Sequence, residues 1–417
     1  MVFDAEHGAL VTTSVAIIGA GPAGLMAAEQ LAARGRVVTV YDRMASPARK
    51  LLMAGRGGLN ITHSEDFDQF ATRYGNCGDA LRGALTAWPP QAALAWLAGL
   101  GIETFAGSSG RVFPREMKAS PLLRAWLRRL EADGVRLVLG HDWTGFDTSG
   151  ALLFKSSSGE QATVYADAVV LALGGASWPR LGSNGAWLAI LSQAGVSVSP
   201  LAPANCGILI AWSEHVSARF GGAPLKRIAL SIGSRTVRGE AIVTRSGLEG
   251  GAVYAISSLV REAVAATGVA SLTLDLRPNM TLEELVQRLS TPRGKQSAVN
   301  FLRKVVSLTP AAIALLREAG PLPAQPAALA ERIKSLPLTA TGCCGLERAI
   351  STAGGVMFEA LDANYMLRSR PGTFVAGEML DWDAPTGGYL LQATLSTAVA
   401  AAAGVHQWLA ARESPGR

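Results

Sequence analysis

A short apolar run that ends in a glycine-rich turn constrains this chain more than any other feature. Residues 15–24 read VAIIGAGPAG, and apolar residues then recur at helical spacing at Leu25, Ala28, Leu31 and Ala32. This pattern predicts a strand, a tight turn and a helix. Gly19 permits the turn, Gly21 lets a pyrophosphate approach the backbone, and Gly24 lets the helix pack closely on the strand.

A second strand completes a strand–helix–strand unit. The run Val37–Tyr41 follows Gly35 and ends at Asp42, eighteen residues after Gly24, where a carboxylate can accept hydrogen bonds from ribose hydroxyls. The amides at the start of the predicted helix face the phosphates. We therefore predict a dinucleotide site, whose identity as FAD or NAD these residues leave open, on Gly19, Ala20, Gly21, Pro22, Ala23, Gly24 and Asp42.

Two later segments favour FAD. Residues 166–175 and 372–381 read as buried strands that end in glycines, and Asp381 is suited to accept from a ribityl or phosphate-side hydroxyl. Thr386 to Tyr389 then open a long apolar helix. Its N-terminus carries about half a positive charge, which would favour an anionic reduced flavin.

Length and composition exclude several classes of protein. At 417 residues we expect two or three domains, and 49% hydrophobic with 17% charged residues indicates a globular chain. No run of about 18 uninterrupted apolar residues occurs, so we expect no membrane span. The first twelve residues carry Asp4 and Glu6 but no Lys or Arg, which does not fit a secretory signal and favours the cytoplasm.

The cysteines show no metal-binding spacing. We expect reduced thiols and no metal, and no disulfide between the neighbours Cys343 and Cys344, since adjacent side chains usually point apart. The four cysteines are Cys77, Cys206, Cys343 and Cys344.

The positive charge of the chain is concentrated in its middle part. Residues 201–340 hold 16 Lys and Arg against 9 Asp and Glu, whereas the remainder holds 22 against 23. Such a surplus attracts nucleic acid, an anionic small molecule or the phosphates of a nicotinamide cofactor. No RNP, KH or helix-turn-helix signature accompanies it, so we interpret it as a solvated surface and do not expect nucleic acid as a partner.

The pattern changes in the middle of the chain. Residues 226–232, 239–244 and 271–275 read as strands, and 251–266 as one helix. Thr281 to Glu284 has capping-box spacing and Thr309 precedes Pro310, which predicts two more helices, with residues 321–326 as a stiff connector. We predict an inserted domain at 201–340, β-rich over 201–278 and helical over 279–340, between parts of one domain at 1–200 and 341–417.

The chain resembles a known family, the BaiN-like and aminoacetone-oxidase-like FAD-dependent oxidoreductases of bacteria. The resemblance runs nearly end to end. Its landmarks are GAGPAG at 19–24, YDR at 41–43, RKLLMAGRGGLNITHSE at 49–65, GRVFP at 110–114, LALGGASWPRLGSNG at 171–185, STAGGV at 351–356 and AGEMLDWDAPTGGYLLQ at 376–392.

This resemblance implies an α/β fold: a Rossmann-like FAD domain of the glutathione-reductase type, with a parallel sheet, interrupted by an insert that shapes the substrate pocket. Two positions depart from many relatives, which have Cys where Leu59 stands and Asn where Leu390 stands. Besides the glycine turn and Asp42, the implied cofactor contacts are Arg43, Lys50, Gly55, Gly57, Asn60, Gly174, Gly175, Gly377, Glu378, Asp381, Gly387, Gly388, Tyr389 and Leu390.

The expected activity is FAD-dependent oxidation or reduction of a small organic substrate. The family suggests an NAD(P)H-driven enone reductase or an amine oxidase that releases hydrogen peroxide. A second dinucleotide fingerprint is missing, so any NAD(P)H would dock transiently. Lys50 and Tyr389 are candidates for a chemical role, but no catalytic residue and no oligomeric state is assigned. An RNA-binding flavoprotein and a non-catalytic flavin-binding protein are the alternatives.

Overall fold

The computed structural model describes residues 2–4, 9–11, 14–75 and 78–413. The chain forms two compact units: unit 1 comprises Met1–Ala202 and Ser351–Arg417, and unit 2 comprises Pro203–Ile350. The boundary expected at residue 340 falls earlier than the one in the structure. The reason is that β20 (Gly342–Cys343) still pairs with β14 (Ile208–Leu209) inside unit 2.

Unit 1 is built on a parallel sheet of five strands in the order β22-β12-β3-β4-β8. All neighbouring pairs are parallel. Residues 15–18 are all buried, as expected for a sheet that is covered on both faces. The predicted α/β class is therefore confirmed. The strands are β3 (Ser14–Ile18), β4 (Val37–Asp42), β8 (Arg136–Leu139), β12 (Ala168–Leu171) and β22 (Thr373–Val375).

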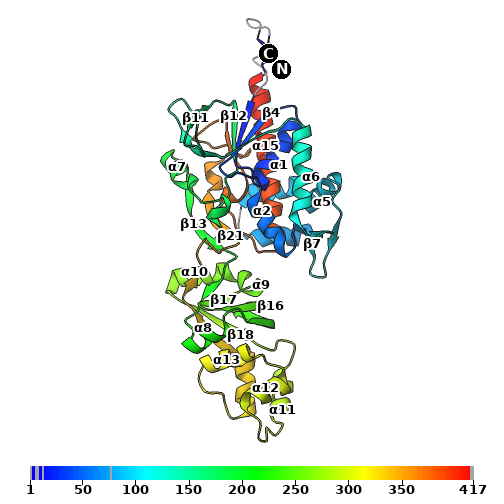
Figure 1. Cartoon of the computed structure of the whole chain (residues 1–417), viewed down its shortest axis with the longest axis vertical. Coiled ribbons are helices and arrows are strands. Elements are labelled where there is room, and N and C mark those ends of the chain that lie inside the picture. Colours follow the sequence, from blue (N-terminus) through cyan, green and yellow to red (C-terminus); the bar gives the residue numbers. More distant parts are fainter. Residues whose placement is uncertain (1, 5–8, 12–13, 76–77, 414–417) are drawn as a thin grey trace. The chain divides into compact units, whose positions relative to one another are not determined.

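Two helices from opposite ends of the chain pack side by side against this sheet. The first, α1 (Pro22–Ala32), begins at the glycine turn with Pro22 at its first position. The second, α15 (Tyr389–Glu413), lies along α1 in Figure 1. Both were predicted, and together they bring the two ends of the chain to one region. The other helices of unit 1 are α2 (Arg49–Ala54), α3 (Phe67–Ala71), α4 (Gly78–Ala87), α5 (Pro90–Gly99), α6 (Ala119–Ala132) and α7 (Trp187–Gln193).

Smaller sheets complete unit 1. A three-stranded antiparallel sheet contacts β4, where the ring of Phe154 stacks on Tyr41 with centroids 4.6 Å apart. The chain enters unit 2 through β13 and returns from it through β21. These two strands are neighbours in a two-stranded sheet. The remaining strands are β1 (Val2–Asp4), β2 (Ala9–Val11), β5 (Thr62–His63), β6 (Thr104–Ala106), β7 (Arg111–Pro114), β9 (His141–Phe146), β10 (Leu152–Ser156), β11 (Gln161–Val164), β13 (Val198–Ala204) and β21 (Ser351–Val356).

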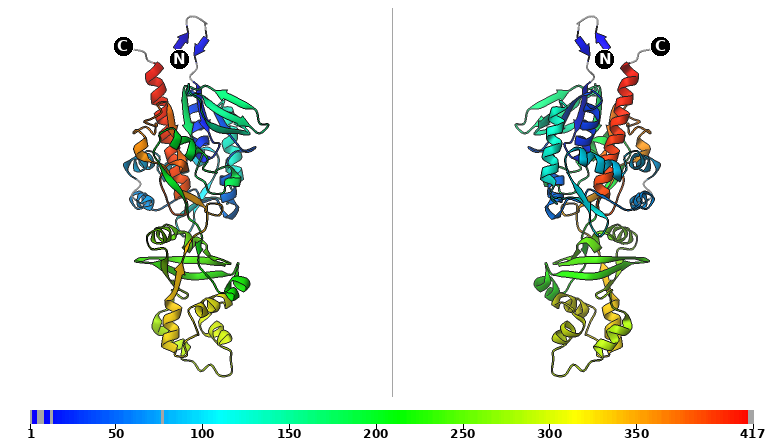
Figure 2. Two further views of the ribbon diagram at one scale, coloured as in Figure 1. Left: turned by 90° about the vertical axis from the view of Figure 1, so that its left-hand side faces the viewer. Right: turned by 90° about the vertical axis from the view of Figure 1, so that its right-hand side faces the viewer.

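Unit 2 is an antiparallel sheet of seven strands with its own apolar core. The order is β19-β18-β15-β16-β17-β14-β20, and Figure 2 shows the long β15–β16 hairpin with helices α11 to α14 (yellow) gathered at one end of the unit. The other strands are β15 (Pro224–Ile232), β16 (Arg235–Thr244), β17 (Gly247–Glu249), β18 (Ala270–Asp275) and β19 (Leu336–Ala340).

The helices of unit 2 correct the sequence-based prediction in two places. The helix expected at 251–266 is split into α9 (Gly251–Tyr254) and α10 (Ser257–Thr267), because Ile256 leaves the helical conformation between them. Four helices follow instead of two: α11 (Leu282–Leu289) with the predicted capping box at Thr281, α12 (Ala298–Val306), α13 (Pro310–Glu318) capped by Thr309, and α14 (Pro326–Lys334). The remaining helix of the unit is α8 (Glu214–Phe220).

Within the described residues, no single helix has the length and apolar content of a membrane span. Only α12 and α13 together reach them, and these two helices are bent by 117°. No group of three or more His, Cys, Asp or Glu side chains in the described part of the chain could hold a metal ion.

Candidate dinucleotide site

Four sheet strands end on the same edge of unit 1. Strand β4 ends at Asp42, and Gly19, Gly174 and Gly377 follow β3, β12 and β22; all four are predicted site residues. In open α/β sheets this carboxyl edge is where ligands bind. The structure therefore brings together residues that lie far apart in the sequence, although their contact with a cofactor stays a prediction.

The first and third glycines of the turn are required by packing. Gly19 has φ +108°, and a Cβ there would lie 2.3 Å from the carbonyl oxygen of Ala172. A Cβ on Gly24 would lie 1.8 Å from the carbonyl oxygen of Gly19. The sequence predicted a tight turn and a close helix–strand contact at these positions, and both are present.

Gly21 is different, because nothing within the protein requires a glycine there. Its φ of −81° suits any residue, and an added Cβ would meet no atom within 4 Å. It precedes Pro22 at the start of α1, whose first turn carries no acidic residue. Open space before the free amides of a helix fits an approaching pyrophosphate, so the turn fits the group that the sequence predicts.

Asp42 holds the turn together. Its Oδ2 accepts from the amide of Ala20 and its Oδ1 from the amide of Met44, each at 2.7 Å. Burial raises the pKa of the Asp42 carboxyl above its ordinary value, while these amides and nearby arginines oppose the rise. Its neighbour Arg43 is half-buried, with Nε 3.6 Å from Asp142 Oδ1.

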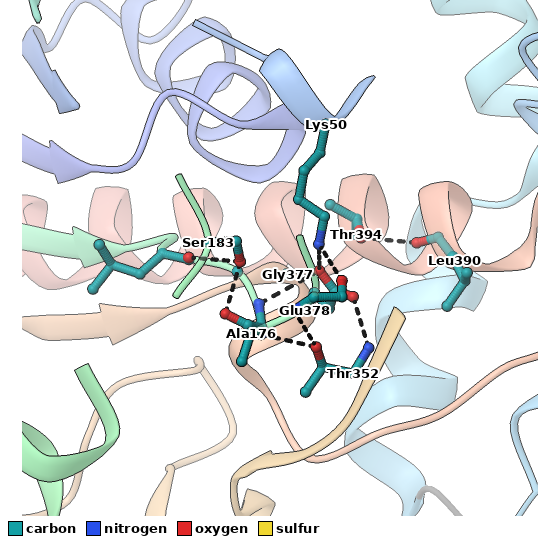
Figure 3. A network of polar contacts seen from close by, with 12 residues as sticks. Lys50, Ala176, Ser183, Thr352, Gly377, Glu378, Leu390 and Thr394 are labelled. Atoms are coloured by element: carbon teal, nitrogen blue, oxygen red, sulfur yellow. Dashed lines mark hydrogen bonds and ion pairs between the residues drawn. The ribbon is translucent and has the colours of Figure 1, made fainter. Parts of the chain in front are cut away.

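Lys50 lies in a polar network that joins four segments of unit 1 (Figure 3). From α2, its Nζ lies 2.8 Å from Glu378 Oε2 and donates to Ser177 Oγ at 2.8 Å. The other oxygen of Glu378 accepts from the amide of Thr352 at 3.1 Å. The ammonium of Lys50 is thus shared between a carboxylate and a hydroxyl, which makes it a positioning group in this conformation.

The turn after β12 closes on the same network. The hydroxyl of Thr352 accepts from the amides of Ala176 at 2.8 Å and Ser177 at 3.0 Å. A Cβ on Gly175 would lie 2.3 Å from that hydroxyl oxygen, and Gly174 has φ +69°. The two glycines predicted here let the turn approach Thr352, and Ser183 Oγ holds it by donating to Gly175 O at 2.7 Å.

Tyr389 fixes the start of α15 through a partly buried charged cluster. Its hydroxyl donates to Glu65 Oε1 at 2.5 Å, and Arg73 donates to both oxygens of the same carboxylate. Burial raises the pKa of Tyr389 above its usual range, and the hydrogen bond to Glu65 adds to this. Burial works to raise the pKa of Glu65, but hydrogen bonds from Arg73 and Tyr389 lower it overall. The phenol therefore stays protonated, with its hydrogen engaged by the carboxylate.

Strand β5, which follows the predicted contact Asn60, meets the start of α15. Gly388 has φ +98°, and a Cβ there would lie 2.5 Å from the backbone of Thr62. Asn60 Nδ2 donates to the carbonyls of Thr62 and Val112 at 2.9 Å. Its Oδ1 is buried and lacks a hydrogen-bond partner among residues 14–75 and 78–413. This open acceptor fits a bound ring that carries an N–H group, as the flavin ring does.

Other predicted contacts have mainly local roles. The amide of Gly377 donates to Thr397 Oγ1 at 3.0 Å, and a Cβ on Gly377 would lie 2.7 Å from Ala23 Cβ on α1. Asp381 accepts from the hydroxyl of Ser199, so it faces β13 in this structure. A Cβ added to Gly55 would meet Ala119, whereas one added to Gly57 would meet no atom within 4 Å. Gly387 has a positive φ of +133°, and Leu390 is half-buried.

Sequence reasoning missed the side chains that complete these two clusters. They are Glu65, Arg73, Ser177 and Thr352. Three of them lie inside the family landmarks at 49–65, 171–185 and 351–356, which is the signal that could have drawn attention to them. Arg73 has no such signal.

A parallel sheet with a glycine turn after its first strand, and a returning C-terminal segment at the same edge, define a nucleotide-binding protein of the Rossmann type. The family model described as HI0933-like protein Rossmann domain matches residues 13–404. The chain belongs to this family of BaiN-like and aminoacetone-oxidase-like FAD-dependent oxidoreductases, and the resemblance found in the sequence is confirmed.

Known proteins show the same relationship. The chain is 26% identical over 396 residues to the 3-dehydro-bile acid delta(4,6)-reductase of Clostridium scindens, covering 91% of this chain and 95% of the relative. It is 25% identical over 401 residues to the ribosomal RNA dihydrouridine synthase of Haemophilus influenzae, covering 93% and 96%. The structure of 3-ketosteroid delta1-dehydrogenase from Sterolibacterium denitrificans matches with a TM-score of 0.54 at 14% identity, covering 95% and 100%, which shows a shared fold.

Proposed function

We propose that this FAD-dependent oxidoreductase reduces a carbon–carbon double bond conjugated to a carbonyl group, with NAD(P)H as electron donor. The names of the two relatives support this chemistry. The double bonds of a 3-dehydro-delta(4,6) bile acid are conjugated to its ketone, and dihydrouridine arises when the uracil double bond next to a carbonyl is reduced. The two substrates share little besides this conjugated group.

The observation that supports the proposal most is the carboxyl edge of the sheet in unit 1, where the predicted dinucleotide-binding residues lie together. When bound, FAD supplies hydride transfer. The open start of α1 at Gly21 would hold the pyrophosphate, and Asn60 Oδ1 would accept from the flavin ring. With no second glycine turn of this kind in the sequence, NAD(P)H would bind only transiently.

The chain's own residues limit where a proton can come from. Leu59, the position at which many relatives have Cys, is 1% exposed and packs in the core of unit 1. Because this residue is a leucine, the chain has no thiol at this position that could protonate the substrate. The Lys50 ammonium and the Tyr389 hydroxyl already donate to Glu378 and Glu65, so both would position the site.

Anaerobic stopped-flow spectroscopy of the FAD-loaded enzyme tests the proposal. Mixing with NADPH should bleach the oxidised flavin band, and cyclohexenone, a simple conjugated enone, should restore it. Photoreduced enzyme serves as the control, because it separates reaction with the enone from reaction with the donor. Flavin that NADPH and cyclohexenone both leave unchanged, with peroxide released from an amine in air, would replace the reductase with an oxidase.

A second candidate substrate, uridine in RNA, is favoured by one observation in unit 2. Residues 285–317 contain six Lys and Arg and no Asp or Glu. All six side chains are exposed: Arg288, Arg293, Lys295, Arg303, Lys304 and Arg317. Arg227 lies close enough to Arg277 to lower the pKa of its guanidinium, though less than burial does, which extends the positive surface toward β15. Such a surface suits a phosphate backbone, although no RNA-binding motif was found in the sequence.

Binding of ribosomal RNA at several salt concentrations tests this candidate. The variant Arg303→Gln/Lys304→Gln should bind more weakly and reduce the slope of log K against log salt by about 0.7–0.9 for each phosphate that it no longer neutralises. The matched control is Arg124→Gln/Arg128→Gln, which removes two exposed charges from α6 in unit 1. Equal binding by both variants, or binding that salt does not weaken, would remove RNA as the substrate.

A further inference from the structure

Three cysteines lie together in unit 2. Cys206 follows β13, Cys343 ends β20, and the amide of Cys344 donates to the carbonyl of Gly207 at 2.8 Å. All three are free thiols, and Cys206 is completely buried whereas Cys343 and Cys344 are partly exposed. Cys77 lies outside the described residues.

Strand register places Cys206 and Cys343 on the same side of the sheet. The antiparallel pair β14–β20 sets Ile208 opposite Cys343, and Cys206 stands two positions before Ile208. Cys206 and Cys343 are therefore diagonal neighbours, since side chains two positions apart point to one face. The two thiols lie close enough to shift the pKa of each other.

Ser257, the first residue of α10, fixes both cysteines. Its hydroxyl accepts from the amide of Cys206 at 3.4 Å, and its carbonyl accepts from Cys343 Sγ at 3.8 Å. One residue therefore contacts the backbone of Cys206 and the thiol of Cys343. The two cysteines are thus kept side by side in the reduced protein.

The two thiols differ in reactivity. A hydrogen bond from Cys206, and next the positive charge of Arg261, lower the pKa of Cys343 against the effect of burial. The hydrogen bond to Cys343 and burial raise the pKa of Cys206. A partly exposed thiol with a lowered pKa attacks an oxidant, and a buried neighbour can then attack the oxidised sulfur.

We infer that Cys206 and Cys343 form a modification site at which a hydroperoxide converts the two thiols into a disulfide. The Cys343 thiolate attacks one peroxide oxygen, which breaks the O–O bond and gives a sulfenic acid and hydroxide. The Cys206 thiol then attacks that sulfur, forms the S–S bond and expels the second oxygen as water. Two thiols and one hydrogen peroxide give one disulfide and two waters.

This bond would enclose nearly the whole of unit 2. Cys206 lies just after the first residue of the unit, Pro203, and Cys343 lies shortly before its last residue, Ile350. A disulfide that closes a long loop stabilises a protein mainly by restricting the unfolded chain. The oxidised form should therefore unfold at a temperature several degrees higher than the reduced form.

Peptide mapping of the FAD-loaded, full-length enzyme tests the inference. After treatment with hydrogen peroxide and alkylation, tryptic digestion without reductant should yield peptides 181–219 and 335–348 joined by a disulfide. Cys344→Ser should keep this linked pair, and Cys343→Ser should lose it. A disulfide within peptide 335–348, or Cys343 oxidised to sulfinic acid while Cys206 remains a thiol, would overturn the inference.

Unfolding temperature gives a second readout that does not depend on a buried substitution. Peroxide should raise it in the wild type and in Cys344→Ser, and dithiothreitol should reverse the rise. Cys343→Ser, which changes a partly exposed residue, should show no rise. A similar rise in Cys343→Ser would mean that the stabilisation comes from another modification.

Discussion

Replacing Tyr389 by Phe isolates one partly buried hydrogen bond at the start of α15. The substitution removes the hydroxyl that donates to Glu65 and leaves Arg73 bound to both oxygens of the carboxylate. Tyr389 is 5% exposed and the Glu65 side chain 9%, so water cannot replace the lost donor. A hydrogen bond to a charged group contributes about 1.5–3 kcal/mol, and we expect a loss of about 2 kcal/mol. This corresponds to a fall of about 5 °C in the unfolding temperature.

The pH dependence of this difference follows from the two pKa shifts. The pKa of Glu65 is lowered on folding, so its stabilisation is present above the ordinary value of 4.5 and is lost as the pH falls below it. The pKa of Tyr389 is raised, so its stabilisation is present below its ordinary value of 10.0 and is lost as the pH rises above it. The difference between wild type and Tyr389→Phe should be largest between these two limits.

Urea unfolding of both proteins across the pH range measures the difference directly. Tyr165→Phe is the matched control, because Tyr165 is 74% exposed and its hydroxyl should contribute nothing. An unfolding free energy within about 0.5 kcal/mol of the wild type at neutral pH would refute the reasoning, since that is the range of ordinary surface substitutions. A difference that persists unchanged in acid would refute the assignment of Glu65 as the acceptor.

Three further predictions concern the turn, the polar network and unit 2. Gly24→Ala should disrupt unit 1, because its Cβ would lie 1.8 Å from a carbonyl oxygen, whereas Gly21→Ala should leave thermal unfolding of the apoprotein unchanged and weaken FAD binding in a fluorescence titration. Lys50→Met should lower the unfolding free energy by about 1 kcal/mol, since both partners of its ion pair are partly exposed. Glu378→Gln should cost at least as much, because its amide nitrogen would face either the Lys50 ammonium or the Thr352 amide, donor against donor. Thr281→Ala should cost about 1 kcal/mol in chemical unfolding through loss of the capping box, and an unchanged midpoint would show that α11 does not depend on it.

Local patterns predicted the elements of the sheet and the turn well. The strand at Val15–Ile18, the glycine turn and the caps at Thr281 and Thr309 depend on residues close in sequence, and the structure has all of them. The helix α12 was missed although Ser297 caps it, because no acidic residue follows at capping-box spacing. The division between α9 and α10 was missed because it depends on one residue, Ile256.

The clusters could not be read from local patterns. Glu378 lies 328 positions from Lys50, and Tyr389 lies 324 positions from Glu65. Such pairs are brought together by the parallel sheet and by the packing of α15 on α1, which no spacing along the chain encodes. Three statements are still predictions: the contacts of the glycines and polar side chains with FAD, the location of the enzyme in the cell, and the boundaries of its functional domains.

The pairing of β13 with β21 has a consequence for how this protein can change. The chain leaves unit 1 and returns to it along two adjacent strands, so the exit and entry points stay fixed whatever lies between them. We expect that a segment attached through such a two-stranded stem can be lengthened, shortened or replaced by an unrelated fold without altering the carboxyl edge of the sheet in unit 1. Replacing unit 2 by a tight hairpin should therefore leave a yellow protein that still retains flavin.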